Sequence, residues 1–304
     1  MNHPSNKLIT IGITAYNEGS YLQEAWDSVL KQTDDLWEAV MLLDGGANKM
    51  TQKVFDGISH PSLRKIKLKV NKGPYPCRTQ AIAMTKTDWY FHLDGDDILP
   101  NNAVELILHA INREPKAEFI FGSCEHFGKQ YSKDISPATD TELLCYHPLF
   151  IATSPIKKSL IYKLGGYCTN LKVNADWDFW LSVFENNILG KQVNSVIYRR
   201  RVRQNSLGNK LIAVKPDIIN IIIERHPIFF NSVERKHKAL HYVYEKQARY
   251  YRSIGKRKLA KKYADLTIQN GNPTQIVKSI NLEMQMSSWR YFIRRLYRLW
   301  QLLF

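Results

Sequence analysis

The first 120 residues alternate between short apolar segments with strand character and segments whose apolar residues recur at helical spacing. We predict strands over 8–14, 38–43, 66–70, 89–93 and 117–121. Helices are predicted between them, over 21–29, 49–55, 76–84 and 102–111. Strands that alternate with helices form a mostly parallel, doubly wound sheet, so the sequence predicts an α/β fold.

Polar residues directly follow four of the predicted strands. They are Tyr16-Asn17-Glu18, Asp44-Gly45-Gly46, Asn71-Lys72-Gly73 and Asp94-Gly95-Asp96-Asp97. In a doubly wound sheet, ligands bind beyond the C-terminal ends of the strands. These four groups therefore predict one binding edge.

The densest of the four is the acidic run Asp94-Gly95-Asp96-Asp97. Carboxylates crowded into four residues repel one another unless a cation lies among them. Hard oxygen ligands suit Mg²⁺ or Mn²⁺, which bridge carboxylates to substrate phosphates. We therefore predict a metal–diphosphate clamp with Asp94 and Asp96 as metal ligands. The alternative is an acidic turn before the next helix, because Asp-Gly is a common turn dipeptide.

Further motifs follow in a fixed order along residues 8–208. They are the Tyr16-Asn17-Glu18 turn, a helix of the type YLxEaxxSvLxQT over 21–33, Asp44-Gly45, Asn71 with Gly73 and Arg78, the acidic run, Gly165-Gly166-Tyr167, Asp176-Trp177-Asp178, and Tyr198 with Arg199 and Ser206. Each motif alone is weakly specific, but the ordered set is strongly specific. In this order the chain resembles the glycosyltransferases of family 2, which have the GT-A fold.

The resemblance implies inverting transfer of a sugar from a nucleotide-sugar donor, by default a UDP-sugar, to a carbohydrate or lipid-linked acceptor in surface polysaccharide or glycan synthesis. It implies that Asp176 is the general base for the acceptor hydroxyl. It also implies Mn²⁺ or Mg²⁺ at Asp94 and Asp96, where the ion stabilises the leaving nucleoside diphosphate. Arg78 is expected to pair with Asp44 or with the donor. The implied donor-binding residues are Thr14, Tyr16, Glu18, Asp44, Arg78, Asp94, Arg199 and Arg201.

The sequence departs from the family pattern in four places. They are Leu43 in place of the first of two acids, Cys77-Arg78-Thr79 in place of Ala-Arg-Asn, Ala175 in place of an acid before Asp176, and arginines in place of a histidine after Tyr198-Arg199. Our hypothesis is that Arg200, Arg201 and Arg203 hold the donor diphosphate where that histidine is missing.

Several of these residues also have a purely structural interpretation. They are Asp176 as the N-cap of a helix over 177–184, Tyr16 as a packed turn aromatic, the arginines of 199–203 as a solvated run, and His92 as a satisfied core residue. For His92 the structural interpretation is favoured, because it lies within a predicted strand and the histidines show no metal spacing.

Positive charge is concentrated in the last quarter of the chain. Residues 231–304 carry 16 Lys or Arg against 4 Asp or Glu, whereas residues 1–230 are nearly balanced. We therefore predict a GT-A domain over 1–215 and a basic helical extension over 216–304 whose partner is anionic. A single helical hairpin is predicted over 244–273.

Residues 289–304 predict an amphipathic helix that ends the chain. Its apolar face carries Trp289, Phe292, Ile293, Leu296, Leu299, Trp300 and Leu303, and its basic face Arg290, Arg294, Arg295 and Arg298. At about 25 Å this helix is too short to span a bilayer but suits a membrane interface. The alternative is a helix docked on the protein body or on a second subunit, and in the second case the protein would form a homo-oligomer.

Composition bounds the location of the chain. With 44% hydrophobic and 23% charged residues over 304 positions, it reads as a soluble globular protein. Four scattered cysteines and a polar N-terminus predict a cytoplasmic protein with reduced thiols, peripheral on the inner face of the membrane if the last helix binds there.

Two rival functions stay open. A sugar-nucleotide pyrophosphorylase needs a Gly-rich basic loop after the first strand, where this chain has Ala15-Tyr16-Asn17-Glu18. The other rival is a catalytically inactive GT-A-like module whose basic tail binds RNA or a protein partner. Nucleic acid is the less favoured partner, because basic charge alone is nonspecific.

Overall fold

The structure is a computed structural model that describes residues 7–128, 132–134, 141–146, 153–203, 215–272 and 274–284. The chain divides into two compact units, residues 1–206 and 207–304. Every helix within the described ranges is too short or too polar to span a bilayer. The predicted amphipathic helix over 289–304 lies outside the described residues.

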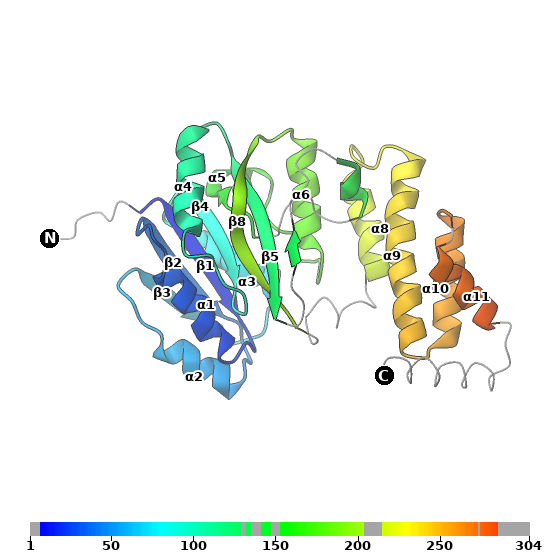
Figure 1. Cartoon of the computed structure of the whole chain (residues 1–304), viewed down its shortest axis with the longest axis horizontal. Coiled ribbons are helices and arrows are strands. Elements are labelled where there is room, and N and C mark those ends of the chain that lie inside the picture. Colours follow the sequence, from blue (N-terminus) through cyan, green and yellow to red (C-terminus); the bar gives the residue numbers. More distant parts are fainter. Residues whose placement is uncertain are drawn as a thin grey trace. The chain divides into compact units, whose positions relative to one another are not determined.

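The first unit is built on an eight-stranded sheet in the order β3-β2-β1-β4-β7-β5-β6, with β8 paired to β5 (Figure 1). β1 to β4 pair in parallel with one another, as do β5 and β8, whereas β6 and β7 are antiparallel to their neighbours. The predicted α/β fold with a mostly parallel sheet is therefore confirmed. The strands are β1 (Ile9–Ala15), β2 (Trp37–Leu43), β3 (Leu63–Lys67), β4 (Trp89–Asp94), β5 (Phe119–Gly128), β6 (Ser132–Asp134), β7 (Ile156–Lys157) and β8 (Gly190–Val202).

Helices connect these strands and cover the sheet. They are α1 (Tyr21–Leu30), α2 (Lys49–Gly57), α3 (Pro74–Ala83), α4 (Ala103–Arg113), a short 3-10 helix (Thr141–Cys145), α5 (Lys158–Lys163) and α6 (Ala175–Glu185). α3 begins with Pro74 after Gly73, whose φ of 85° requires a glycine. This turn allows α3 to begin a few residues after the end of β3.

The two faces of β1 and β4 differ in chemistry. The odd-numbered side chains, such as Ile11, Ile13 and Phe91, belong to the hydrophobic core that α1, α2 and α4 cover. The even-numbered side chains, such as Thr14 and His92, are also buried but polar. Because side chains alternate along a strand, the polar ones form a line that ends at the C-terminal edge of the sheet.

β3 lies three residues earlier than predicted. It ends at Lys67, and the N–H of Leu68 then donates to the carbonyl of Leu43 at 2.9 Å. The chain next crosses Gly45 so closely that a Cβ there would lie 2.2 Å from the backbone of Val70. The crossing removes residues 68–70 from the sheet, although their β-branched and apolar character favours a strand.

The second unit is helical in its described residues, and a helical hairpin forms its centre. α9 (Val233–Ser253) and α10 (Arg257–Gln269) form that hairpin, with α8 (Lys215–Arg225) before it and α11 (Gln275–Met284) after it. Small residues such as Ala248, Ala260 and Ala264 let the helices pack closely. The predicted hairpin over 244–273 therefore exists, although its first helix begins earlier, at Val233.

Candidate active site

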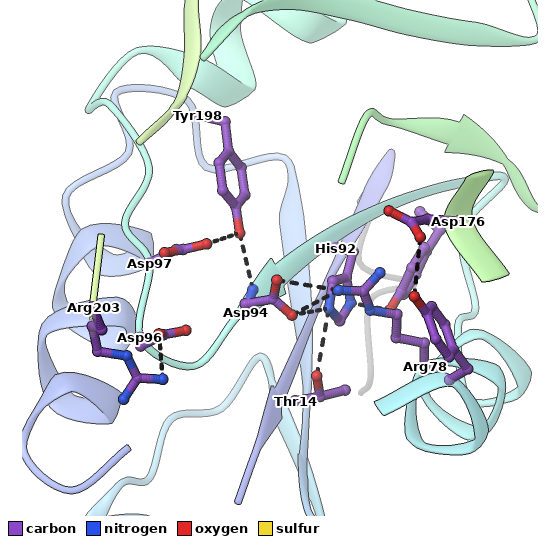
Figure 2. A network of polar contacts seen from close by, with 11 residues as sticks. Thr14, Arg78, His92, Asp94, Asp96, Asp97, Asp176, Tyr198 and Arg203 are labelled. Atoms are coloured by element: carbon purple, nitrogen blue, oxygen red, sulfur yellow. Dashed lines mark hydrogen bonds and ion pairs between the residues drawn. The ribbon is translucent and has the colours of Figure 1, made fainter. Parts of the chain in front are cut away.

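Asp94 ends β4, and donors from within the chain surround its carboxylate (Figure 2). The Nη2 of Arg78 lies 2.8 Å from Oδ1 and 3.1 Å from Oδ2, and the Nε2 of His92 lies 3.0 Å from Oδ1. Burial by itself raises the pKa of Asp94, but Arg78 and His92 outweigh burial and hold this pKa well below its usual value. Asp94 is therefore an anion that anchors Arg78, and Arg78 pairs with it rather than with Asp44.

His92 lies behind Asp94 and is almost fully buried. Its Nε2 faces the Asp94 carboxylate and lies 3.4 Å from Thr14 Oγ1, and its Nδ1 lies 2.9 Å from the Tyr90 hydroxyl. A carboxylate only accepts, so Nε2 carries the hydrogen and the Tyr90 hydroxyl donates to Nδ1. Burial, and then the charge of Arg78, lowers the pKa of His92 to about 4, so the ring is neutral at pH 7.

The buried His92 predicts a pH-dependent contribution to stability. Below pH 6.5, the usual pKa of histidine, the unfolded chain binds a proton at His92, whereas the folded chain binds it only near pH 4. The stability that the neutral, buried His92 contributes therefore falls as the pH falls. We expect the difference in unfolding free energy between wild type and His92→Gln to shrink by about 3 kcal/mol between pH 7 and pH 4. Urea unfolding at four pH values measures it, and a constant difference would contradict the prediction.

Asp96 and Asp97 lie in the turn that follows β4. Asp97 accepts a hydrogen bond from the Tyr198 hydroxyl at 2.9 Å, and Asp96 Oδ2 lies 2.5 Å from Nη2 of Arg203. Burial first, and then the charge of Asp94, raises the pKa of both carboxyls. The turn therefore holds more negative charge than its surroundings favour, which is the condition for binding a cation.

The predicted diphosphate ligands Arg199 and Arg201 are engaged within the protein. Arg199 Nε lies 2.5 Å from Glu125, and Arg201 Nη2 lies 2.6 Å from Glu24. The Arg201 guanidinium also lies over the ring of Tyr21, 4.2 Å from its centroid. These contacts give both arginines a structural role in holding β8 beside the acidic turn, and their contact with a donor stays a prediction.

At this site, two buried guanidinium nitrogens have no hydrogen-bond partner in the part of the chain that the structure describes. They are the Nε atoms of Arg78 and Arg203. A buried donor without an acceptor costs about 1–3 kcal/mol, which a bound acceptor recovers. Because Arg78 contacts Asp94 and Arg203 contacts Asp96, these donors mark a place for an anionic ligand beside the acidic turn.

Asp176 lies in the first turn of α6, close to Tyr75 of α3. The Tyr75 hydroxyl donates to Asp176 Oδ1 at 3.0 Å, and the charges of both Asp176 and Asp94 act on Arg78 (Figure 2). The N-cap of α6 is Asn174, with a φ of 64°, so the interpretation of Asp176 as an N-cap is wrong. The structure brings the predicted base to the same edge as the acidic turn.

The loop after β1 contributes Tyr16 and Glu18 to this edge. The Tyr16 ring is 39% exposed, which opposes its interpretation as a packed turn aromatic. The backbone N–H of Tyr16 donates to the Glu18 carboxylate. Burial, and to a smaller extent the charge of Asp96, raises the pKa of Glu18, which shows that this carboxyl neighbours the acidic turn. Thr14, by contrast, is buried against His92.

Asp44 is buried and holds two loops together through hydrogen bonds to their backbone. Its carboxylate accepts from the backbone N–H groups of Gly45, Lys72 and Gly73, each at 2.8 Å. These bonds hold the entry to α3 and so position Arg78. Only 5% of Asp44 is exposed, so its predicted contact with the donor stays a prediction beside this structural role.

The donor chemistry of the acidic turn fits one divalent cation at Asp96. Both carboxylate oxygens of Asp94 accept hydrogen bonds from Arg78 or His92. Arg203, in contrast, is the only side-chain partner of Asp96 among the described residues. No group of three or more His, Cys, Asp or Glu side chains within the described ranges forms a metal site. Mg²⁺ sites that bind substrate phosphates use only one or two carboxylates of the protein. Because the oxygens of Asp94 are already engaged, Asp96 fits better than Asp94 as the ligand.

Two tyrosines of the site escaped the sequence analysis. Tyr75 contacts Asp176, and its ring lies 5.6 Å from the Arg78 guanidinium. Tyr167, which appeared only within a turn motif, is also buried and hydrogen-bonded to Arg78. The signal for Tyr75 was its spacing of three residues from Arg78, which places both on one face of α3. No comparable signal linked Tyr167 to Arg78.

Comparison with known proteins identifies the fold. Residues 1–349 of S. aureus TarS, in complex with UDP-GlcNAc, superpose with a TM-score of 0.60 at 14% identity, over 86% of this chain and 89% of that chain. The mannosyltransferase PcManGT of Pyrobaculum calidifontis, in complex with GDP-Man and Mn²⁺, gives a TM-score of 0.57 at 14% identity, over 90% and 86% of the two chains. Both similarities concern the GT-A fold.

Sequence comparison identifies the family. An uncharacterized glycosyltransferase of Haemophilus influenzae is 25% identical over 186 residues, which are 59% of this chain and 62% of that protein. The chain thus spans less than two thirds of this relative. The family model described as Glycosyl transferase family 2 matches residues 10–164, half of the chain, and includes β1 to β4, the acidic turn and Arg78. The chain belongs to glycosyl transferase family 2.

Proposed function

We propose that the chain transfers a sugar from a nucleotide-sugar donor to a carbohydrate or lipid-linked acceptor, with inversion at the anomeric carbon. The observation that carries this proposal is the meeting of Asp94 and Asp176 around the buried Arg78 at the ligand-binding edge of the sheet. The UDP-GlcNAc and GDP-Man complexes of the similar structures support a nucleotide-sugar donor. A UDP-sugar is the proposed default, and a surface polysaccharide or glycan the proposed product.

The site offers a group for each part of such a donor. The exposed Tyr16 ring can stack on the base, and Glu18 and Asp44 lie nearby as acceptors for base or ribose. The unpartnered Nε donors of Arg78 and Arg203 would contact the diphosphate oxygens. Asp96 would hold Mn²⁺ or Mg²⁺, which, when bound, stabilises the charge of the leaving nucleoside diphosphate.

Asp176 acts as the general base in this proposal. It takes the proton of the acceptor hydroxyl while the acceptor oxygen forms its bond to the anomeric carbon. The bond from that carbon to the diphosphate breaks, and the nucleoside diphosphate leaves with the electron pair. The Tyr75 hydroxyl keeps the Asp176 carboxylate oriented. One displacement inverts the configuration, so no enzyme nucleophile takes part.

A nucleotide screen tests the proposed function. The melting temperature of the full chain is measured with UDP, GDP, CMP and dTDP, each with and without Mn²⁺. A ligand at a hundred times its Kd stabilises the folded state by about 2.7 kcal/mol, so we expect one nucleoside diphosphate to raise the melting temperature by several degrees. The matching nucleotide sugar should then release that nucleoside diphosphate.

The same assay distinguishes the rival functions. Release of pyrophosphate from a mixture of a sugar phosphate and a nucleoside triphosphate would indicate a pyrophosphorylase. No response to any nucleotide or nucleotide sugar, together with tight RNA binding, would indicate an inactive module with a basic tail.

A further inference from the structure

The turn between α9 and α10, which Figure 1 locates in the second unit, carries a dense set of positive charges in its sequence. From residue 246 to residue 262 the chain has eight Lys or Arg and no Asp or Glu. Because the two helices form a hairpin, the last turn of α9 and the first turns of α10 lie at the same end of it. We define the basic apex as Arg252, Ile254, Lys256, Lys258 and Lys262.

The side chains of the basic apex are presented outward. Lys256, Lys258 and Lys262 are exposed, and none of them makes an ion pair within the described residues. Ile254, the C-cap residue of α9, is 42% exposed in the middle of these charges. The turn therefore has one exposed apolar side chain among its exposed cations.

The aromatic residues of this region pack against one another, and none of them is more than partly exposed. The rings of Tyr251 and Tyr263 stack on each other at 5.6 Å, and Tyr250 packs against Tyr251 at 5.3 Å. These rings contact the alanines that close the hairpin. Proteins that bind single-stranded nucleic acid combine positive charge with exposed aromatic platforms, and the basic apex has the charge without the platform.

We propose that the basic apex binds the surface of an anionic membrane, with Ile254 in the headgroup region and Lys256, Lys258 and Lys262 against the anionic lipid headgroups. An apolar tip with a basic surround matches the two forces that hold proteins at such an interface. This site is distinct from the amphipathic segment predicted over 289–304. It does not depend on the transferase chemistry, because vesicle binding is measured without turnover.

Co-sedimentation of the full chain with vesicles tests the proposal. We expect binding to phosphatidylcholine vesicles that contain phosphatidylglycerol, weak binding to pure phosphatidylcholine, and a decrease with salt. The triple variant Lys256→Glu/Lys258→Glu/Lys262→Glu should lower the partition coefficient at least about a hundredfold. Ile254→Ser, which keeps every charge, should lower it severalfold.

The matched control reverses three exposed lysines of the first unit, Lys31, Lys53 and Lys116, for the same change in net charge. This control should bind nearly as wild type does, and all variants should keep the wild-type melting temperature. If the control and the apex variant lost vesicle binding equally, net charge alone would explain the loss, and the proposal would be overturned. Unchanged binding of the apex variants, or an RNA homopolymer that displaces wild type from the vesicles at equal phosphate, would overturn it too.

Discussion

We expect Asp176→Asn to lower kcat for sugar transfer about a thousandfold and to leave the KM for the donor unchanged. Asparagine keeps the volume of the side chain and can still accept the hydrogen bond that the Tyr75 hydroxyl donates at 3.0 Å in the wild type. It cannot take the proton of the acceptor hydroxyl, and a positioned general base contributes about 10²–10⁴-fold. Steady-state kinetics with varied donor at saturating acceptor measure both constants.

Two further variants make this result specific. Tyr75→Phe keeps the Asp176 carboxylate and removes its hydrogen-bond donor, so we expect a loss of about tenfold in kcat with an unchanged KM for the donor. Asp56→Asn removes an exposed carboxylate of α2 and should change nothing. If Asp176→Asn kept kcat within threefold of wild type, or changed only the donor KM, Asp176 would not be the base.

The sequence predicted the sheet well because the apolar pattern of its strands is continuous. β1 and β2 are buried on both faces, so most of their residues are apolar, and polar turns mark their ends. β3 was misplaced because its boundary depends on a contact between distant residues. Gly45 admits the backbone of Val70, and nothing near residue 70 in the sequence signals that contact.

The site residues were predicted with less success in their individual roles. The motifs located Asp94, Asp96 and Asp176, but spacing cannot show which carboxylate is already satisfied. Asp94 proves to be bound by Arg78 and His92, and this follows from the line of polar side chains on one face of β1 and β4. The predicted strand over 89–93 stopped before Asp94, so it placed His92 in the interior without its neighbour two residues on along the same face.

The arginines illustrate the same limit. A run of arginines after a strand reads as a free cationic group, yet β8 continues to Val202 in register with β5. Pairing places Arg199 opposite Glu125, and the guanidinium of Arg199 contacts that carboxylate. Arg203 lies beyond the paired segment and contacts the Asp96 carboxylate, while Arg201 within that segment donates to the Asp96 carbonyl.

Asp96→Asn removes the effect of Mn²⁺ on nucleotide binding. In the wild type we expect UDP, or whichever nucleoside diphosphate the screen identifies, to raise the melting temperature more with Mn²⁺ than without it. Asparagine at position 96 cannot neutralise a divalent ion, so the added stabilisation by Mn²⁺ should disappear while the smaller effect of the nucleotide alone persists. Thermal unfolding with and without Mn²⁺ at fixed nucleotide concentration measures the difference.

The variant Asp94→Asn supplies the contrasting control, because the two carboxylates have different partners. Arg78 is nearly buried, and loss of the Asp94 charge removes the ion-pair partner of its guanidinium, so we expect the melting temperature of the ligand-free protein to fall by about 5 °C. Among the described residues, the side chain of Asp96 is paired only with Arg203, so its variant should unfold near the wild-type temperature. An Asp94→Asn variant that kept its melting temperature but lost the Mn²⁺ effect would reverse this assignment and make Asp94 the metal ligand.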